Sequence, residues 1–335
     1  MSDSLQRIFV SHVAGLGQTV LAVPALRALR YAFPQSQITV AASYSAADIV
    51  QLSRCANLIV PVSRSQELIN PRASYRSLQS LNALRRAQYD LTLELQRNAE
   101  GGLARWLAQL GSGQRHKKLL TQIREAWLRK SLTQKHAAQR YLEVLTEIGA
   151  HAIDREPKLY TDRAADERIE QRLEKSGLLA SGLLIGIHPG AGRNQPRWSA
   201  EKFAVVAAKL IHTLDARVLI FAGPNERGLA RSITKQLPPK QALAFESIPL
   251  PEMASALARL SVFIAHQSGP AQLAAALGTP VVATSLLSLP HTNDLLSRNH
   301  VLLRKETLDA ITTDEIFEAA CQLIKSNRAE FLWAR

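Results

Sequence analysis

The chain has 335 residues, 46% of them hydrophobic, which is long enough for two domains that each bury a core. No apolar run approaches the length of a membrane span, and the first residues show no pattern of a secretory signal. Cys55 and Cys321 stand far apart and do not indicate a disulfide framework, and no spacing of Cys and His predicts a metal site. We therefore expect a cytoplasmic protein that holds no metal.

The net charge of +13 is concentrated in the first half of the chain. Residues 1–150 contain 19 Lys and Arg against 9 Asp and Glu, and residues 115–140 alone contain eight basic residues and one acid, Glu125. This half is expected to attract an anionic partner. Leu120, Ile123 and Trp127 share one helical face, which is typical of a basic amphipathic helix at an anionic membrane surface. A helix packed on the core with a solvated back explains the same pattern equally well. Nucleic acid is not expected, because aromatic residues make up only 5% of the chain and no recognised motif occurs.

Short apolar runs alternate with helical patterns along the whole chain. In the first half we predict strands at 8–10, 38–42, 58–61 and 91–95, with helices at about 19–32 and from about 46. In the second half we predict strands at 183–188, 218–222, 262–265 and 280–284, and helices at 200–213, 226–236 and 271–277. This alternation predicts an α/β protein with parallel sheets, arranged as two Rossmann-like domains. The charged stretch 162–182 is the expected join, and a last helix, 313–332, has no strand after it.

The first strand is followed by Gly15-Leu16-Gly17, a tight turn that ends at Gln18. A dinucleotide-binding loop would have a third glycine near Val20 and an acid after the second strand, and neither is present. An NAD site is therefore not expected. The glycines allow the backbone to approach a ligand, although an ordinary connection between strand and helix is an equal alternative.

The loop HPGAGRNQPRW follows the predicted strand 183–188 and precedes a helix capped by Ser199. It offers backbone N–H groups around Gly190 and two guanidinium groups, from Arg193 and Arg197. Such donors beside a helix start are suited to a phosphate or diphosphate. A solvated basic loop is the alternative.

Two further turns follow predicted strands of the second half. Glu226 stands where an acid can accept hydrogen bonds from ribose hydroxyls, although a carboxylate that complements a helix dipole explains it as well. Ser268 and Gly269 precede Pro270 at a helix start, where free N–H groups favour an anion; a capped helix with nothing bound is the alternative. Since the carboxyl ends of parallel strands meet at one edge, one diphosphate between two helix starts, with a ribose acid nearby, explains all three turns together.

Taken together, these motifs resemble glycosyltransferase family 9, the ADP-heptose:lipopolysaccharide heptosyltransferases. The resemblance is carried by GLGQTVLAVPALRALRYAFP, YDLTLELQ, HAAQRYLEVLTEIGA, IGIHPGAGRNQPRWSAEKF, FAGPNERGLA and SGPAQLAAALGTPVVA. It implies a GT-B fold, with two Rossmann-like domains facing across a cleft. Residues 1–165 would bind the acceptor, residues 166–312 would bind the nucleotide-sugar, and residues 313–335 would form a helix that packs back on the first domain.

The resemblance also implies the chemistry. It implies an inverting, metal-independent transfer of heptose or a related sugar from an ADP-linked donor, with no other cofactor. The acceptor would be lipopolysaccharide or another anionic envelope glycan, met by a cytoplasmic protein peripheral to the inner membrane. The implied donor residues are Gly190, Arg193, Arg197, Glu226, Gln267, Ser268, Gly269 and Gln272. The implied acceptor residues are Gly17, Arg115, Lys117 and Lys118.

Among the departures from the family pattern, three replace acid or base side chains by glutamine. The family's proposed general base, an Asp, corresponds to Gln18 here, and the Asp and His of its nucleotide turn correspond to Gln267 and Gln272. A glutamine cannot accept the proton, and loss of a positioned base typically removes about 10²–10⁴-fold of rate. His12 or Glu94 are alternative bases, although His12 also fits a simple strand-end residue. Two functions therefore stay open: an active glycosyltransferase, or a catalytically impaired nucleotide-sugar-binding or scaffold protein.

Overall fold

The computed structural model describes residues 5–62, 84, 87–96, 135–178, 182–192, 195–224, 226 and 228–333, with only the backbone for 328–333. The chain divides into two compact units, Met1–Leu159 and Tyr160–Arg335. The join therefore lies a few residues before the expected boundary at 165, which falls inside helix α7 (Arg163–Lys175). This helix packs against α10 (Leu250–Ala258) and belongs to the second unit, with Asp162 as its N-cap.

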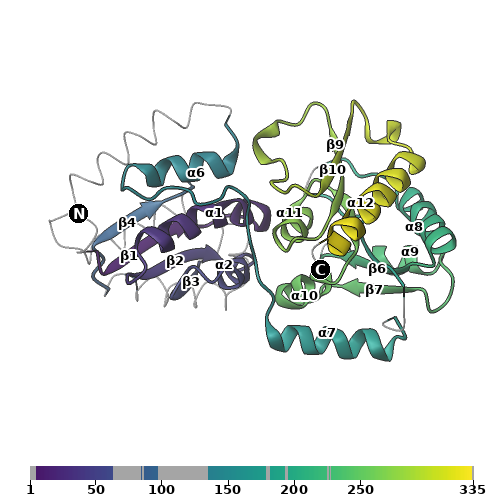
Figure 1. The fold of residues 1–335 in the computed structure, drawn as a ribbon, viewed down its shortest axis with the longest axis horizontal. Helices are drawn as coiled ribbons and strands as arrows, with labels where there is room; N and C mark the ends of the chain where they lie inside the picture. Colours follow the sequence, from purple (N-terminus) through teal and green to yellow (C-terminus); the bar gives the residue numbers. More distant parts are fainter. Residues whose placement is uncertain are drawn as a thin grey trace. The chain divides into compact units, whose positions relative to one another are not determined.

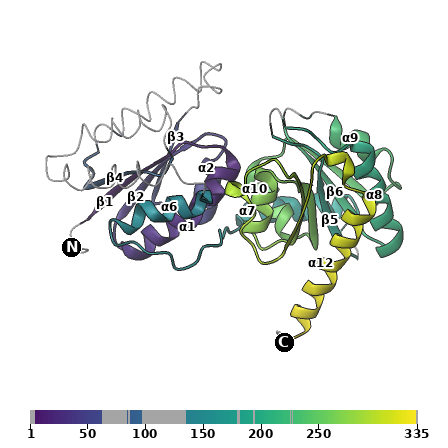
Figure 2. The same ribbon diagram turned by 90° about the horizontal axis from the view of Figure 1, so that it is seen from above.

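The first unit contains a parallel sheet with the strand order β3-β2-β1-β4. Its strands are β1 (Arg7–His12), β2 (Gln37–Ser43), β3 (Leu58–Val62) and β4 (Leu91–Glu94), which confirms the four predicted strands. The described helices are α1 (Leu16–Ala32), α2 (Ala47–Ser53) and α6 (Ala137–Thr146), and α6 packs beside α1 (Figure 1, Figure 2).

Helix α1 begins earlier than the glycine pattern predicts. Gly15 is its N-cap, so Gly17 and Gln18 lie in the first helical turn and not in a loop. The hydroxyl of Thr19 donates to the carbonyl of Gly15 at 3.1 Å, which secures this turn. Nearly every side chain from Thr19 to Leu29 is buried, as expected for a helix in the middle of an α/β layer.

The second unit contains a six-stranded parallel sheet with the order β10-β9-β8-β5-β6-β7. Its strands are β5 (Leu184–His188), β6 (Arg217–Ala222), β7 (Ala242–Glu246), β8 (Val262–His266), β9 (Val281–Leu286) and β10 (His300–Lys305). Its other helical elements are α8 (Ala200–Leu214), α9 (Leu229–Thr234), α11 (Gly269–Ala276), the 3₁₀ turns η3 (His291–Asn293) and η4 (Leu308–Ala310), and α12 (Thr313–Trp333). The sequence pattern missed β7, β10 and α10, since the two strands lie at the sheet edges and are mostly half-buried.

Helix α12 contributes its described side chains to the core of the second unit. Ile316, Ala320 and Ile324 repeat at four-residue spacing and are buried there, and the helix lies beside α8 (Figure 1). From the sequence, this helix is expected to pack on the first domain, whereas its first turns pack on the core of the second unit. A contact of its last turns with the first domain stays a prediction. Among the helices that the structure describes, none is both long and apolar enough to cross a membrane.

Candidate functional site

The carboxyl edge of the six-stranded sheet carries the polar groups of the second unit. Strand order reverses between β5 and β8, which pair in parallel, and ligands of open α/β sheets bind at such a reversal. β5 ends at His188 and β8 at His266, and both imidazoles are buried. The predicted turns that follow β5, β6 and β8 therefore do meet at one edge.

The carboxylate of Glu226 is held against the glycine loop that follows β5. Its side chain is only 8% exposed; its Oε2 accepts from the Gly223 N–H at 2.9 Å and lies 3.4 Å from His188 Nε2. Arg197 approaches the other oxygen at 3.7 Å. A Cβ on Gly190 would lie 1.9 Å from Glu226 Oε1, so only glycine leaves room for this carboxylate.

Burial raises the pKa of Glu226, but His188, the Gly223 N–H and Arg197 together outweigh it and hold that pKa below its usual range. Glu226 is therefore an anion at neutral pH. In this structure its carboxylate accepts a hydrogen bond from the backbone of Gly223, and the expected hydrogen bonds from a ribose stay a prediction.

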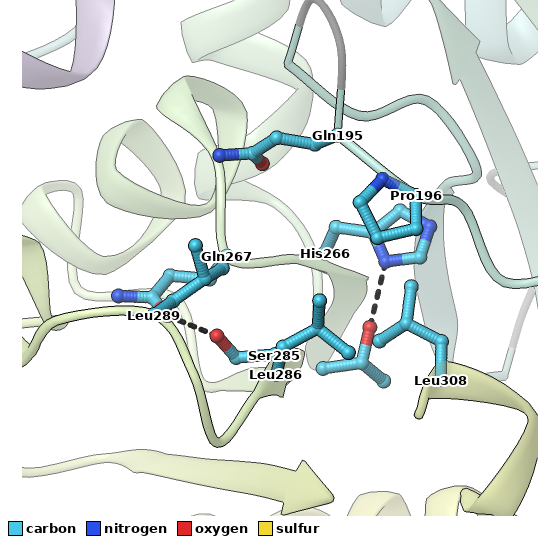
Figure 3. A pocket seen from close by; sticks show the side chains of 9 residues that line it. Gln195, Pro196, His266, Gln267, Ser285, Leu286, Leu289 and Leu308 are labelled. Carbon is cyan, nitrogen blue, oxygen red and sulfur yellow. Dashed lines mark hydrogen bonds between the residues drawn. The ribbon is translucent and has the colours of Figure 1, made fainter. Parts of the chain in front are cut away.

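His266 is a neutral side chain with a defined tautomer. The backbone N–H of Trp198 donates to His266 Nε2 at 3.2 Å. The ring hydrogen of the neutral imidazole is therefore on Nδ1, which donates to Thr284 Oγ1 at 2.8 Å. Burial, with smaller contributions from His188 and Arg197, lowers the pKa of His266 to about 4. Figure 3 shows His266 and Pro196 lining the same pocket, and the dashed line from the imidazole marks its hydrogen bond to Thr284.

A small open pocket lies beside this histidine, at the ends of β8 and β9 (Figure 3). Its apolar lining comes from Pro196, Leu286, Leu289 and Leu308, and Gln267 and Ser285 are among its polar residues. Ser285 Oγ donates to Gln267 Oε1 at 2.6 Å. Among the predicted donor residues that the structure describes, Gln267 alone lines this pocket.

The start of α11 has the expected form, with Ser268 as N-cap in extended conformation and Pro270 in the first turn. The Ser268 hydroxyl makes no capping bond, and within the described residues its Oγ is buried with no hydrogen-bond partner. Gly269 is the first helical residue. This helix start thus retains N–H groups that can receive an anion.

Gln267 and Gln272 both bind the turn η3. Gln267 Nε2 donates to the carbonyl of Asn293 at 3.1 Å and to Asp294 Oδ1 at 2.8 Å. Gln272 Nε2 donates to the carbonyls of Asn293 and Asp294 at 2.8 and 3.2 Å. Both amides therefore hold this turn against the start of α11, an arrangement that the sequence alone did not predict.

In the first unit, Gln18 is linked to Tyr141 of α6. The Tyr141 hydroxyl donates to Gln18 Oε1 at 2.7 Å, and Gln96 Oε1 lies 3.2 Å from the same hydroxyl oxygen. Burial raises the pKa of Tyr141 well above its usual range, against a smaller opposing effect of Arg140, so the phenol keeps its proton. Gln18 is thus positioned by a hydrogen bond between segments far apart in sequence, and neither side chain of that bond is an acid.

His12 does not have the properties of a general base. It is fully buried and packs edge-on against Tyr141, with ring centroids 5.2 Å apart. Neither ring nitrogen makes a hydrogen bond within the described residues. Burial lowers its pKa to about 4, against a smaller opposing effect of the Gln18 backbone. Such an imidazole is neutral at pH 7, a weak base, and out of contact with solvent.

The remaining predicted residues divide between described and undescribed parts. Gly17 lies in the first turn of α1, next to Gln18. Arg193, Arg115, Lys117 and Lys118 lie outside the described residues, as does most of the basic stretch 115–140. Their predicted roles stay predictions.

The sequence profile of glycosyltransferase family 9 (heptosyltransferase) matches residues 78–309, which is more than half of the chain. The chain belongs to glycosyltransferase family 9. Lipopolysaccharide heptosyltransferase 3 of Escherichia coli is 29% identical over 146 residues. That match covers 42% of this chain and 42% of the relative, so the chain spans about two fifths of the length of this curated relative.

Solved structures of family-9 enzymes share the fold over nearly the whole chain. A family-9 glycosyltransferase from Veillonella parvula superposes with a TM-score of 0.79 at 20% identity, covering 97% of this chain and 99% of that one. The ADP-heptose lipopolysaccharide heptosyltransferase II of E. coli superposes with a TM-score of 0.73 at 18% identity, covering 97% and 100%. The GT-B fold expected from the sequence is thereby confirmed.

Several site residues were not recognised in the sequence of this family-9 protein. His188 and His266 each end an apolar strand, LIGIH and VFIAH, which is a signal that could have identified them. Tyr141 and Asp294 carry no comparable local signal, because their partners come from distant segments.

Proposed function

We propose that this protein transfers heptose or a related sugar from an ADP-linked donor to lipopolysaccharide or another envelope glycan. The transfer is inverting and needs no metal. The observation that supports the proposal is that Arg197, Glu226 and the start of α11 follow strands that meet at the reversal point of the six-stranded sheet, in a chain of glycosyltransferase family 9. One structure of the same fold, heptosyltransferase II of E. coli, is named for ADP-heptose.

The donor contacts follow from this cluster. The N–H groups at the start of α11, with Ser268 and Gly269, receive the diphosphate, and Arg197 and Arg193 add positive charge. Glu226 accepts from the ribose hydroxyls once its carboxylate turns away from the Gly223 N–H. The basic segment that includes Arg115, Lys117 and Lys118 meets the anionic acceptor, in a cytoplasmic protein at the inner membrane surface.

Calorimetry with ADP and with ADP-heptose tests the donor assignment. We expect both to bind, and Arg197→Ala to weaken binding by roughly tenfold, since one charge-assisted contact is worth about 1.5–3 kcal/mol when fully formed. Lys209→Ala, on the exposed side of α8, is the control that changes charge elsewhere and leaves affinity unchanged. An absence of binding for every nucleotide up to millimolar concentration would refute the assignment.

The second candidate is a catalytically impaired member that binds nucleotide-sugars or serves as a scaffold. The observation that favours it is that Gln18, Gln267 and Gln272 all bond to groups of the chain itself. Gln18→Asp distinguishes the two functions. If the native protein does not transfer the sugar and Gln18→Asp does, the result supports a catalytically impaired family member. If the native protein itself transfers the sugar, the result contradicts that second candidate.

A further inference from the structure

The turn η3 carries a histidine paired with a carboxylate. His291 Nδ1 lies 2.7 Å from Asp294 Oδ2, and the imidazole is 78% exposed. Because a carboxylate accepts, Nδ1 holds the hydrogen and Nε2 of the neutral ring keeps its lone pair. A base oriented through its other ring nitrogen by a carboxylate is the arrangement that hydrolases and transferases use to remove a proton.

The carboxylate of this pair is firmly placed. Asp294 Oδ1 accepts from Gln267 Nε2 at 2.8 Å and from the guanidinium of Arg304, whose side chain is only 10% exposed. Arg304 also donates to the Leu289 carbonyl at 3.1 Å, which ties strand β10 to the loop. Gln272 holds the backbone of the same turn. Two glutamines and one arginine thus fix the position from which Asp294 orients His291.

The pair lies close to the proposed donor site within the same unit. Gln267 immediately precedes Ser268, the N-cap of α11, and it bonds directly to Asp294. A donor whose diphosphate is held at this helix start has its reacting carbon in the same region. Since sugar and histidine would both belong to the second unit, the arrangement does not depend on position 18 in the first.

We propose that His291 is the general base of the transfer, with Asp294 as its positioning residue, an inference that rests on the proposed glycosyltransferase function. Nε2 takes the proton of the acceptor hydroxyl while that oxygen bonds to the anomeric carbon. The bond from this carbon to the diphosphate oxygen breaks, and its electron pair leaves with the nucleoside diphosphate. Asp294 stabilises the resulting imidazolium, whose proton then passes to solvent. The glutamines at 267 and 272 serve this pair by holding its turn.

The test compares native protein with His291→Ala, His291→Gln and the control His212→Gln, which changes an exposed histidine on α8. Transfer from the ADP-sugar is followed kinetically, and donor affinity by calorimetry. We expect kcat to fall about 10²–10⁴-fold in both His291 variants, as for loss of a general base, with unchanged donor affinity. His291→Gln keeps a donor toward Asp294 and serves as the check on folding.

Imidazole added to His291→Ala provides a readout that a structural role would not change. We expect it to restore part of kcat, because the site is exposed, and to have no effect on the native protein or on His212→Gln. Asp294→Asn should lower kcat without response to imidazole. Native transfer that persists in His291→Ala would overturn this inference and leave the proposed function standing. Nucleotide binding without native transfer would also overturn it, and absence of nucleotide binding would overturn both.

Discussion

Gly190→Ala tests the packing of Glu226 against the glycine loop. The added Cβ would lie 1.9 Å from Glu226 Oε1 and 2.2 Å from its Cδ, so the carboxylate has to leave its position. It then loses the hydrogen bond from the Gly223 N–H at 2.9 Å, its contact with His188 Nε2 at 3.4 Å and its ion pair with Arg197. The glutamate can turn toward solvent, so the cost comes from these broken interactions and not from a backbone clash.

The magnitude follows from the hydrogen bond and the ion pair that the displaced carboxylate breaks. A hydrogen bond to a charged group contributes about 1.5–3 kcal/mol, and the other partners are left without a compensating charge. We expect the free energy of unfolding of the second unit to fall by about 2–3 kcal/mol, or its Tm by about 5–10 °C for a unit of this size. Gly192→Ala is the control in the same loop, since the nearest atoms of the described residues to its Cβ would be those of the Gln195 side chain, at 3.4 Å.

The assay is urea unfolding in a double-mutant cycle with Glu226→Ala. If the carboxylate is the obstacle, Gly190→Ala should cost less than about 0.5 kcal/mol once Glu226 is truncated. The same cost for Gly190→Ala in both backgrounds would refute the reasoning, because the strain would then come from the loop backbone. Nucleotide affinity measured on the same proteins shows whether Glu226 also contacts the donor.

Three further predictions concern other buried groups. Tyr141→Phe removes the hydroxyl that contacts Gln18, and should lower the free energy of unfolding by about 1 kcal/mol; an unchanged value in urea titration would contradict this. Burial holds the pKa of His12 at about 4, so between pH 6.5 and 4 the unfolded chain binds a proton that the folded chain does not. Stability should therefore fall as the pH is lowered through this range, by about 3 kcal/mol from this residue, and His12→Phe should remove that part of the pH dependence while keeping transfer activity. Gln272→Ala removes two hydrogen bonds to the η3 turn and should cost about 1–2 kcal/mol, with Gln272→Glu at least as costly, because a carboxylate cannot donate to carbonyls; a Glu variant as stable as native would show that the bonds contribute nothing.

The elements of the fold follow largely from local pattern. Eight strands and the long helices occur close to where apolar runs and helical periodicity predict them, because burial on one or both faces imposes that period on the sequence. The pattern does not identify edge strands such as β7 and β10, whose residues are only partly buried. It also places the start of α1 three residues late, since glycines that permit a turn can also stand in a first helical turn.

The sequence by itself determined the fold class, the family and the loops at which a ligand is expected. Only the tertiary structure decided what the side chains in those loops contact. Gln267 and Asp294 are 27 residues apart, and Tyr141 and Gln18 are 123 apart. Such pairs depend on strand order, register and rotamers, which no short window of residues contains. For that reason three glutamines that look like missing catalytic groups in the sequence are seen in the fold to bond to neighbouring segments, two of them beside an oriented histidine.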